Sequence, residues 1–204
     1  LELIENNKEN YELFFLVGTT YLQLKEYTEA INNYNFSIKL NPAHPNSYNN
    51  KGIALAEKQN YSEAILNYDK AIKLKKDYFD AYLNKGISLY KLKKFDQAIK
   101  YFKLLIQIRP SEPKIYNNLG NTYKDLGMLN EALEPYLKAI EITPNYPALY
   151  NNLGTVFREL GKLEKAVEFY SKGLTINPDF IDILNNLGVV LNDLARFDEA
   201  INIF

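Results

Sequence analysis

The sequence predicts an all-α fold made of stacked antiparallel helix pairs, and three observations support this prediction. The first is a glycine that recurs at one constant interval, at Gly18, Gly52, Gly86, Gly120, Gly154 and Gly188. The second is an alanine that recurs at the same interval, at Ala30, Ala64, Ala98, Ala132, Ala166 and Ala200. The third is that each interval contains two amphipathic helical patterns joined by a short turn. Together they predict a repeated helical hairpin.

The segment 147–180 shows the repeating unit most clearly. Its first helix carries apolar or small residues at Tyr150, Leu153, Gly154 and Phe157, and its second at Ala166, Tyr170 and Gly173. A turn is expected at 160–162, and Pro178 follows the second helix, where a residue without an N–H ends a helix. Glycine inside an exposed helix costs about 1 kcal/mol relative to alanine. The recurring glycine therefore predicts close approach of a neighbouring helix backbone.

A 34-residue period with this content resembles the tetratricopeptide repeat (TPR) family, and the resemblance covers essentially the whole chain. It implies a right-handed superhelix, an α-solenoid of antiparallel helix pairs with helices of about 12–14 residues. We expect a single array, in which residues 1–10 end a preceding repeat and 181–204 form a truncated one. The complete repeats are 11–44, 45–78, 79–112, 113–146 and 147–180. Uncapped apolar half-repeats at both ends predict end-to-end self-association.

Three residues depart from the repeated pattern. Lys76 replaces the proline that ends other repeats, so we expect a less sharply defined helix end there. Leu105 stands where a small residue is usual, which predicts local repacking. Pro135 lies inside a second helix and cannot donate to the carbonyl of Glu131, so a bend is expected.

Composition excludes several function classes. The 204 residues carry a net charge of −1, so the net charge does not indicate a class of partner. They contain no cysteine for disulfide or thiolate chemistry. No apolar run approaches the roughly 20 residues that a membrane helix needs. The one histidine, His44, lies between Pro42 and Pro45 and is expected to be a solvated turn residue.

No catalytic set, metal-ligand cluster or phosphate-binding glycine loop is recognisable. We therefore expect a segment that is not an enzyme and that needs no cofactor or metal. A cytoplasmic location is the default expectation, but the chain opens on Leu1 rather than methionine. The absence of a targeting signal is therefore uninformative.

Asparagine recurs at one place on the first helices. Five repeats have an asparagine two residues before the recurring glycine. We call these the rung asparagines, and they are Asn50, Asn84, Asn118, Asn152 and Asn186. The place before them adds Asn49, Asn117, Asn151 and Asn185, and Asn121 directly follows Gly120. With about 100° of turn per residue, these places point away from the packing side and toward a concave groove. Because asparagine costs up to about 0.7 kcal/mol in a helix, its recurrence needs a reason.

Two interpretations of the asparagines remain open. Each carboxamide offers two donors and an acceptor, which suits the alternating N–H and C=O groups of an extended peptide. Alternatively, each carboxamide bonds the next helix and fixes the repeat geometry. The YNNLG segments at 116–120 and 150–154, and LNNLG at 184–188, resemble the repeats of O-linked N-acetylglucosamine transferase. That resemblance implies an asparagine ladder that holds substrate peptide backbone.

The predicted function is therefore a non-catalytic protein–protein interaction scaffold that binds an extended, disordered peptide. The predicted peptide-binding residues are Asn50, Asn84, Asn118, Asn152, Asn186, Asn117, Asn121, Asn151 and Asn185, with selectivity from Asn121, Lys124, Arg158 and Asp182. The alternative is a substrate-recruiting arm of a larger enzyme such as a glycosyltransferase. The carboxylate clamp of chaperone adaptors is not assembled, because asparagines and Asp182 stand where most of its cations would be.

Residues 70–103 contain ten lysines against three aspartates. Such lysines usually form a solvated outer face. An acidic partner is a minor alternative, and the lack of an accompanying arginine or aromatic pattern argues against nucleic-acid binding.

Overall fold

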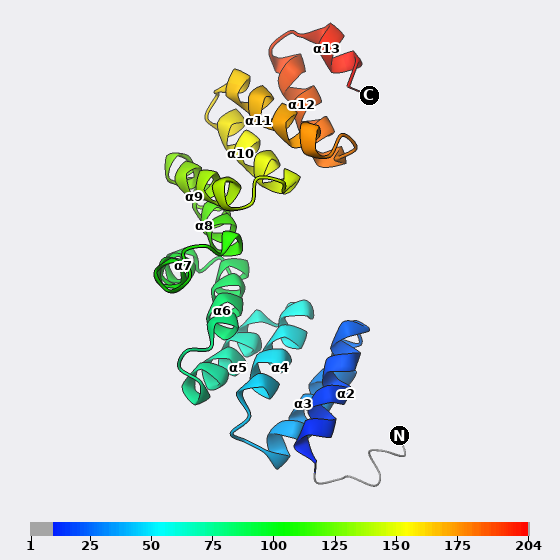
Figure 1. The fold of residues 1–204 in the computed structure, drawn as a ribbon, viewed down its shortest axis with the longest axis vertical. Helices are drawn as coiled ribbons and strands as arrows, with labels where there is room; N and C mark the ends of the chain where they lie inside the picture. The colour runs from blue at the N-terminus through cyan, green and yellow to red at the C-terminus, as the bar shows by residue number, and fades with distance from the viewer. Residues whose placement is uncertain (1–9, 204) are drawn as a thin grey trace. The chain divides into compact units, whose positions relative to one another are not determined.

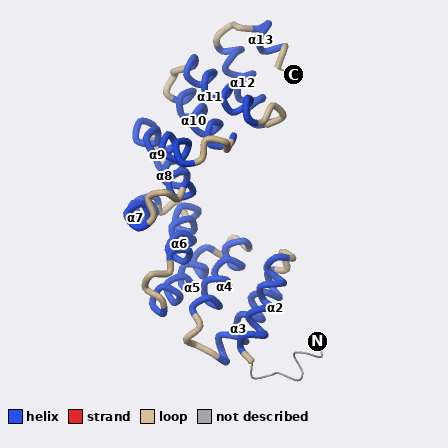
Figure 2. Tube along the Cα trace, viewed as in Figure 1, coloured by secondary structure: helices blue, strands red, loops and turns tan. Residues whose placement is uncertain are grey.

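The computed structural model describes residues 10–203. Within this range Figure 2 shows helices joined by short loops and no strand. The first helices of the repeats, each of 13 residues, are α2 (Tyr11–Gln23), α4 (Pro45–Glu57), α6 (Phe79–Lys91), α8 (Pro113–Asp125), α10 (Pro147–Glu159) and α12 (Ile181–Asp193). The second helices, each of 14 residues, are α3 (Tyr27–Leu40), α5 (Tyr61–Leu74), α7 (Phe95–Ile108), α9 (Leu129–Ile142) and α11 (Leu163–Ile176), and a short α13 (Phe197–Ile201) follows α12. The all-α prediction and the predicted helix lengths are confirmed.

Most of the predicted preceding helix end at residues 1–10 lies outside the described residues. Asn10 is described, and it caps α2, where its side chain accepts hydrogen bonds from the backbone N–H groups of Glu12 and Leu13. Three other first helices begin with a proline, whose missing N–H would have no partner at that position. These prolines are Pro45, Pro113 and Pro147.

The chain forms two compact units, one that extends to Tyr101 and one that begins at Phe102. In the first unit α2 packs on α3, α4 on α5, and each hairpin on the next first helix. The second unit repeats this order from α8 to α13. First helices of neighbouring repeats also touch within each unit, α2 with α4, α4 with α6, α8 with α10 and α10 with α12. This row of contacts brings the recurring asparagines close to one another.

Every hairpin turn is closed by the same backbone motif. In the repeat 147–180, the N–H of Gly161 donates to the carbonyl of Arg158, and the N–H of Lys162 donates to the carbonyl of Phe157, both at 2.9 Å. This is a Schellman motif, which requires a left-handed residue after the helix. The left-handed residues are Lys25, Gln59, Lys93, Gly127, Gly161 and Ala195, with φ between 57° and 80°. The predicted turn at 160–162 is confirmed, and the same turn forms where glycine is absent.

The recurring glycine makes room for an aromatic ring. A Cβ atom on Gly154 would lie 2.5 Å from Cε1 of Tyr170, and one on Gly52 would lie 2.5 Å from Cε1 of Tyr68. Both rings come from the second helix of the same repeat and are at most 1% exposed. The equivalent pairs are Gly18 with Tyr34 and Gly120 with Tyr136. The prediction of a close approach is confirmed, but the partner is a tyrosine ring and not a helix backbone.

The three departures from the pattern have different outcomes. α5 ends at Leu74, one repeat period after Leu40, where α3 ends, so the prediction of a less sharply defined helix end at Lys76 is wrong. Leu105 is fully buried, which is consistent with an enlarged core position. α9 continues without interruption through the buried Pro135, and a bend there stays a prediction.

His44 is half-buried and packs against aromatic rings, so the expectation of a solvated turn residue is only partly correct. Its ring lies edge-on to Phe15 with centroids 4.9 Å apart, and it also contacts Tyr11 at 5.1 Å. Its Nδ1 lies 2.7 Å from Oγ of the buried Ser47, which in turn lies 2.8 Å from Oγ of Ser37. Burial lowers the pKa of His44, and the nearby Glu12 carboxylate opposes this shift.

Candidate functional site

The rung asparagines lie on the first helices, where neighbouring first helices touch. All five are half-buried, and so are Asn117, Asn121 and Asn151, whereas Asn185 is exposed. The expectation that these places point away from the packing side is therefore only partly correct. Asn49 is almost inaccessible, with 3% of its surface exposed. Its Oδ1 accepts a hydrogen bond from Asn84 on the first helix of the next repeat.

Three rungs form a hydrogen bond with the preceding repeat. Asn152 donates from Nδ2 to Oδ1 of Asn117 at 3.0 Å. Asn186 makes the equivalent bond to Asn151 at 2.9 Å, and Asn84 makes it to Asn49 at 3.2 Å. The Asn-Asn dipeptides therefore connect neighbouring first helices, as the structural interpretation predicts. Sequence reasoning did not identify the pairing of the second asparagine of one repeat with the first asparagine of the repeat before.

The other two rungs have local partners. Asn118 donates to the carbonyl of Lys114 in its own helix at 2.8 Å. Asn50 accepts from Nδ2 of Asn49 at 3.2 Å. At the place where a partner for Asn50 would stand, the preceding repeat has Phe15, whose side chain cannot form this bond. The rung is thus present in five repeats, but its bond depends on what the neighbouring repeat supplies.

The bonds between repeats leave hydrogen-bonding capacity unused. A carboxamide has two N–H donors and an oxygen that accepts two hydrogen bonds. The bond from Asn152 to Asn117 uses one N–H of Asn152, and within residues 10–203 its Oδ1 has no partner. A rung can therefore bond a neighbouring helix and a ligand at the same time.

Asn121 has a structural partner that the sequence did not reveal. It accepts a hydrogen bond of 2.6 Å from the hydroxyl of Tyr136, which packs beneath the recurring glycine. In the next repeat Thr155 occupies the same place and lies 3.1 Å from the hydroxyl of Tyr170. Burial raises the pKa of Tyr170, so its hydroxyl stays protonated. A polar residue after the glycine, paired with a tyrosine in the second helix, is the signal that could have found this pair.

The predicted selectivity residues make different contacts. Arg158 lies next to a rung, with Nη1 3.5 Å from Oδ1 of Asn186. Lys124 lies 3.7 Å from the carboxylate of Asp125. Asp182 is exposed near the start of α12. Of these residues, Arg158 is therefore the one with a contact to a rung asparagine among the described residues.

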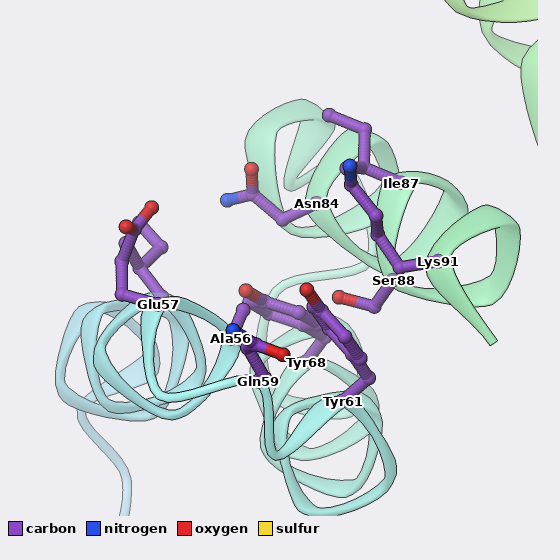
Figure 3. A pocket seen from close by; sticks show the side chains of 10 residues that line it. Ala56, Glu57, Gln59, Tyr61, Tyr68, Asn84, Ile87, Ser88 and Lys91 are labelled. Atoms are coloured by element: carbon purple, nitrogen blue, oxygen red, sulfur yellow. The ribbon is translucent and has the colours of Figure 1, made fainter.

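A pocket of about 400 Å³ lies beside the rung Asn84, between α4, α5 and α6. We call it the Asn84 pocket, and its lining residues are Ile53, Ala56, Glu57, Gln59, Tyr61, Tyr68, Asn84, Ile87, Ser88 and Lys91. Figure 3 shows Tyr61 and Tyr68 at its base, with Asn84, Ile87 and Lys91 from α6 on one side and Glu57 from α4 on the other. Apart from Asn84, the sequence did not single these residues out. Most of them come from helices that only the tertiary structure brings together.

Other site classes find little support in residues 10–203. No group of three or more metal-ligating side chains is present there. No described helix is long and apolar enough to cross a membrane. Of the ten lysines in 70–103, nine are exposed, as predicted for a solvated face. The tenth, Lys85, pairs with Asp69 and lies over the ring of Tyr101.

Comparison with solved structures supports the fold. The chain is similar to the crystal structure of YrrB, described as a TPR protein with an unusual peptide-binding site, with 24% identity over 90% of this chain and 95% of that chain and a TM-score of 0.70. MamA from Desulfovibrio magneticus RS-1 matches with 23% identity, 83% and 96% coverage and a TM-score of 0.77. Pseudomonas aeruginosa pilF matches with 16% identity, 95% and 88% coverage and a TM-score of 0.80. At these identities the likeness establishes the fold alone.

Comparison with protein families is more specific, although no curated protein matches the sequence with significant similarity. The family model described as TPR repeat matches residues 18–59, 52–93 and 120–157. The model described as Tetratricopeptide repeat matches residues 79–112 and 147–180. These matches together cover more than half of the chain, and the two matches of the second model each span one helical hairpin. The chain therefore belongs to the tetratricopeptide repeat family, whose repeats indicate a protein–protein interaction scaffold.

Proposed function

We propose that this scaffold binds an extended peptide by its backbone, through the rung asparagines on the first helices. The observation that carries the proposal is the unused hydrogen-bonding capacity of the rungs, such as Oδ1 of Asn152. Within residues 10–203 the side chain of Asn118 bonds the backbone of its own helix through Nδ2, which leaves its oxygen available to a ligand. Because backbone contacts carry little sequence information, selectivity comes from side chains beside the rungs.

Two further observations favour a peptide as the ligand. An extended peptide presents alternating N–H and C=O groups, and a carboxamide is both donor and acceptor, so one rung can pair with one peptide unit. The similar structure YrrB is described as having a peptide-binding site. The described residues hold no metal-ligand cluster that would suggest another ligand class.

The test is a screen of short peptides against the chain, followed by titration of a bound peptide against the Asn118→Ala variant. One neutral hydrogen bond nets about 0.5–1.5 kcal/mol, so the variant should bind about 2-fold to 13-fold more weakly. Asn118 is the most suitable rung to change, because its side-chain hydrogen bond among the described residues is to its own helix. Replacing Asn118, Asn152 and Asn186 together should weaken binding by roughly two to four kcal/mol if the effects add.

Asn33→Ala is the matched control. Asn33 donates to the carbonyl of Glu29 at 2.8 Å, the same bond within a helix that Asn118 makes, but it lies on the second helix α3. Its replacement should leave peptide affinity unchanged. Equal affinities of the parent, Asn118→Ala and the folded triple variant would refute the rungs as binding groups and leave only their structural role.

The array can also serve as the substrate-recruiting arm of a larger enzyme, such as a glycosyltransferase. The YNNLG and LNNLG segments favour this candidate, since they carry the resemblance to the transferase repeats. Reading the gene beyond the codon for Phe204 tests it directly. A parent protein without a catalytic domain would exclude this role.

A further inference from the structure

In the repeat before the Asn84 pocket, the start of α3 and the end of α4 are joined by hydrogen bonds. The hydroxyl of Tyr27, the first residue of α3, donates to the carboxylate of Glu57, the last residue of α4, at 3.3 Å. Beside it, the ammonium of Lys58 donates to the hydroxyl of Thr28 at 2.8 Å. Each donor in this contact therefore has an acceptor.

The equivalent pair in the next repeat is Tyr61 and Lys91, the first residue of α5 and the last residue of α6. Here the carboxylate is replaced by an ammonium, so two donors stand where the previous repeat has a donor and an acceptor. Among the described residues neither the Tyr61 hydroxyl nor the Lys91 ammonium has a hydrogen-bond or ion-pair partner. Lys91 Nζ lies 5.7 Å from the centre of the Tyr90 ring and makes only that contact. The missing group is an acceptor, and a negatively charged one fits best.

Both side chains line the Asn84 pocket, as Figure 3 shows. Asn84 donates one N–H to Asn49 and retains a second one for a ligand. Ile53 and Ile87 supply apolar surface for the methylene groups of a ligand side chain. The pocket thus combines donors with an apolar wall.

The carboxylate on the opposite wall of the pocket already accepts a hydrogen bond. Glu57 lines the pocket on the α4 side, but its carboxylate accepts the hydrogen bond from Tyr27 in the preceding repeat. The lining holds two charged side chains, Glu57 and Lys91, and Lys91 is the cation that has no hydrogen-bond or ion-pair partner within residues 10–203. Its place is also unusual along the sequence, because the equivalent residues in the six repeats are Gln23, Glu57, Lys91, Asp125, Glu159 and Asp193.

From these observations we infer that the Asn84 pocket binds the side-chain carboxylate of an aspartate or glutamate in the bound peptide. The inference rests on the proposed peptide binding and adds to it one selective position. Lys91 and Tyr61 donate to the carboxylate, and Asn84 donates to the adjoining peptide backbone. Because a lysine occupies this place in one repeat only, it positions the acidic residue at one point along the peptide.

The first experiment screens short peptides with amidated C-termini, so that only side chains supply carboxylates. Bound sequences should be enriched in aspartate or glutamate at one position, and replacing that residue by its amide should weaken binding about tenfold to a hundredfold. Lys91→Met should remove the preference, whereas Lys93→Met, an exposed lysine outside the pocket, should not. Peptides that bind without an acidic preference, or with one that survives Lys91→Met, would overturn the inference and leave the proposed function standing.

A second measurement does not depend on finding a peptide. The chain is titrated with N-acetylglutamate methylamide and, separately, with the glutamine analogue, while NMR follows the side chains of Lys91 and Asn84. The glutamate probe should shift these signals more, and Lys91→Met should abolish the difference. Equal shifts with both probes would overturn the inference. If no peptide binds but the glutamate probe does, the proposed peptide scaffold fails and the carboxylate site remains.

Discussion

The packing of the recurring glycine against tyrosine predicts that Gly154→Ala destabilises the chain, although alanine is the better helix former. The new methyl carbon would lie 2.5, 2.7 and 3.0 Å from Cε1, Cδ1 and Cζ of Tyr170, whereas carbon atoms pack favourably at about 3.5–4.0 Å. Tyr170 is fully buried, and its hydroxyl lies 3.1 Å from that of Thr155, so the ring cannot turn away into water.

Two opposing terms set the size of this effect. Overpacking a core typically costs about 1–3 kcal/mol, and the enclosed ring places this site near the upper limit. Replacing a helical glycine by alanine recovers about 1 kcal/mol. The expected net loss in the free energy of unfolding is therefore about 1–2 kcal/mol.

Urea denaturation followed by circular dichroism measures this loss in a double-mutant cycle with Tyr170→Leu. Once the ring is gone, Gly154→Ala should become neutral or stabilise the chain by up to about 1 kcal/mol. Gly161→Ala is the control, because a Cβ atom there meets nothing within 4 Å and any cost comes from its φ of 70°. The packing argument would be refuted if Gly154→Ala alone were as stable as the parent. It would also be refuted if Gly154→Ala lowered the free energy of unfolding equally with and without Tyr170→Leu.

Lys93 adopts φ 58°, so Lys93→Gly should raise the free energy of unfolding by about 0.5–1 kcal/mol in urea denaturation, and a decrease would contradict the strain assigned to the turn. Asn152→Ala should lower the free energy of unfolding by about 1 kcal/mol in the same assay. Because Asn117→Ala removes the same hydrogen bond, the two losses should not add in the double variant, and full additivity would argue against that bond. Burial lowers the pKa of His44 in the folded chain, so the unfolded chain binds the proton more tightly. Neutral His44 therefore contributes to the free energy of unfolding above its pKa in the unfolded chain, about 6.5. This contribution is lost as the pH falls through its pKa in the folded chain. The drop in Tm between neutral pH and pH near 5 should therefore be smaller in His44→Gln, and an equal drop would exclude this residue as the cause. Light scattering tests the predicted end-to-end self-association, which a monomer would contradict.

By itself the sequence determined the all-α fold and the lengths of its helices. Such features follow from local periodicity, because each amphipathic stripe and each turn lies within a span of a few residues. The recurring Gly154 also indicated a close contact at its own position. Its partner Tyr170 was visible as a recurring apolar residue, but no local rule joined the two.

Only the tertiary structure decided which side chains meet across helices. The bond between Asn152 and Asn117 joins two different repeats, and it depends on how neighbouring first helices cross. The sequence did not predict that Tyr61 and Lys91 line the same pocket, because the two residues lie on separate helices, α5 and α6. His44 was misjudged because its flanking prolines describe the local backbone but not the aromatic rings that surround it. Periodicity thus places each residue along its own helix, whereas contacts between helices depend on a packing geometry that no local pattern encodes.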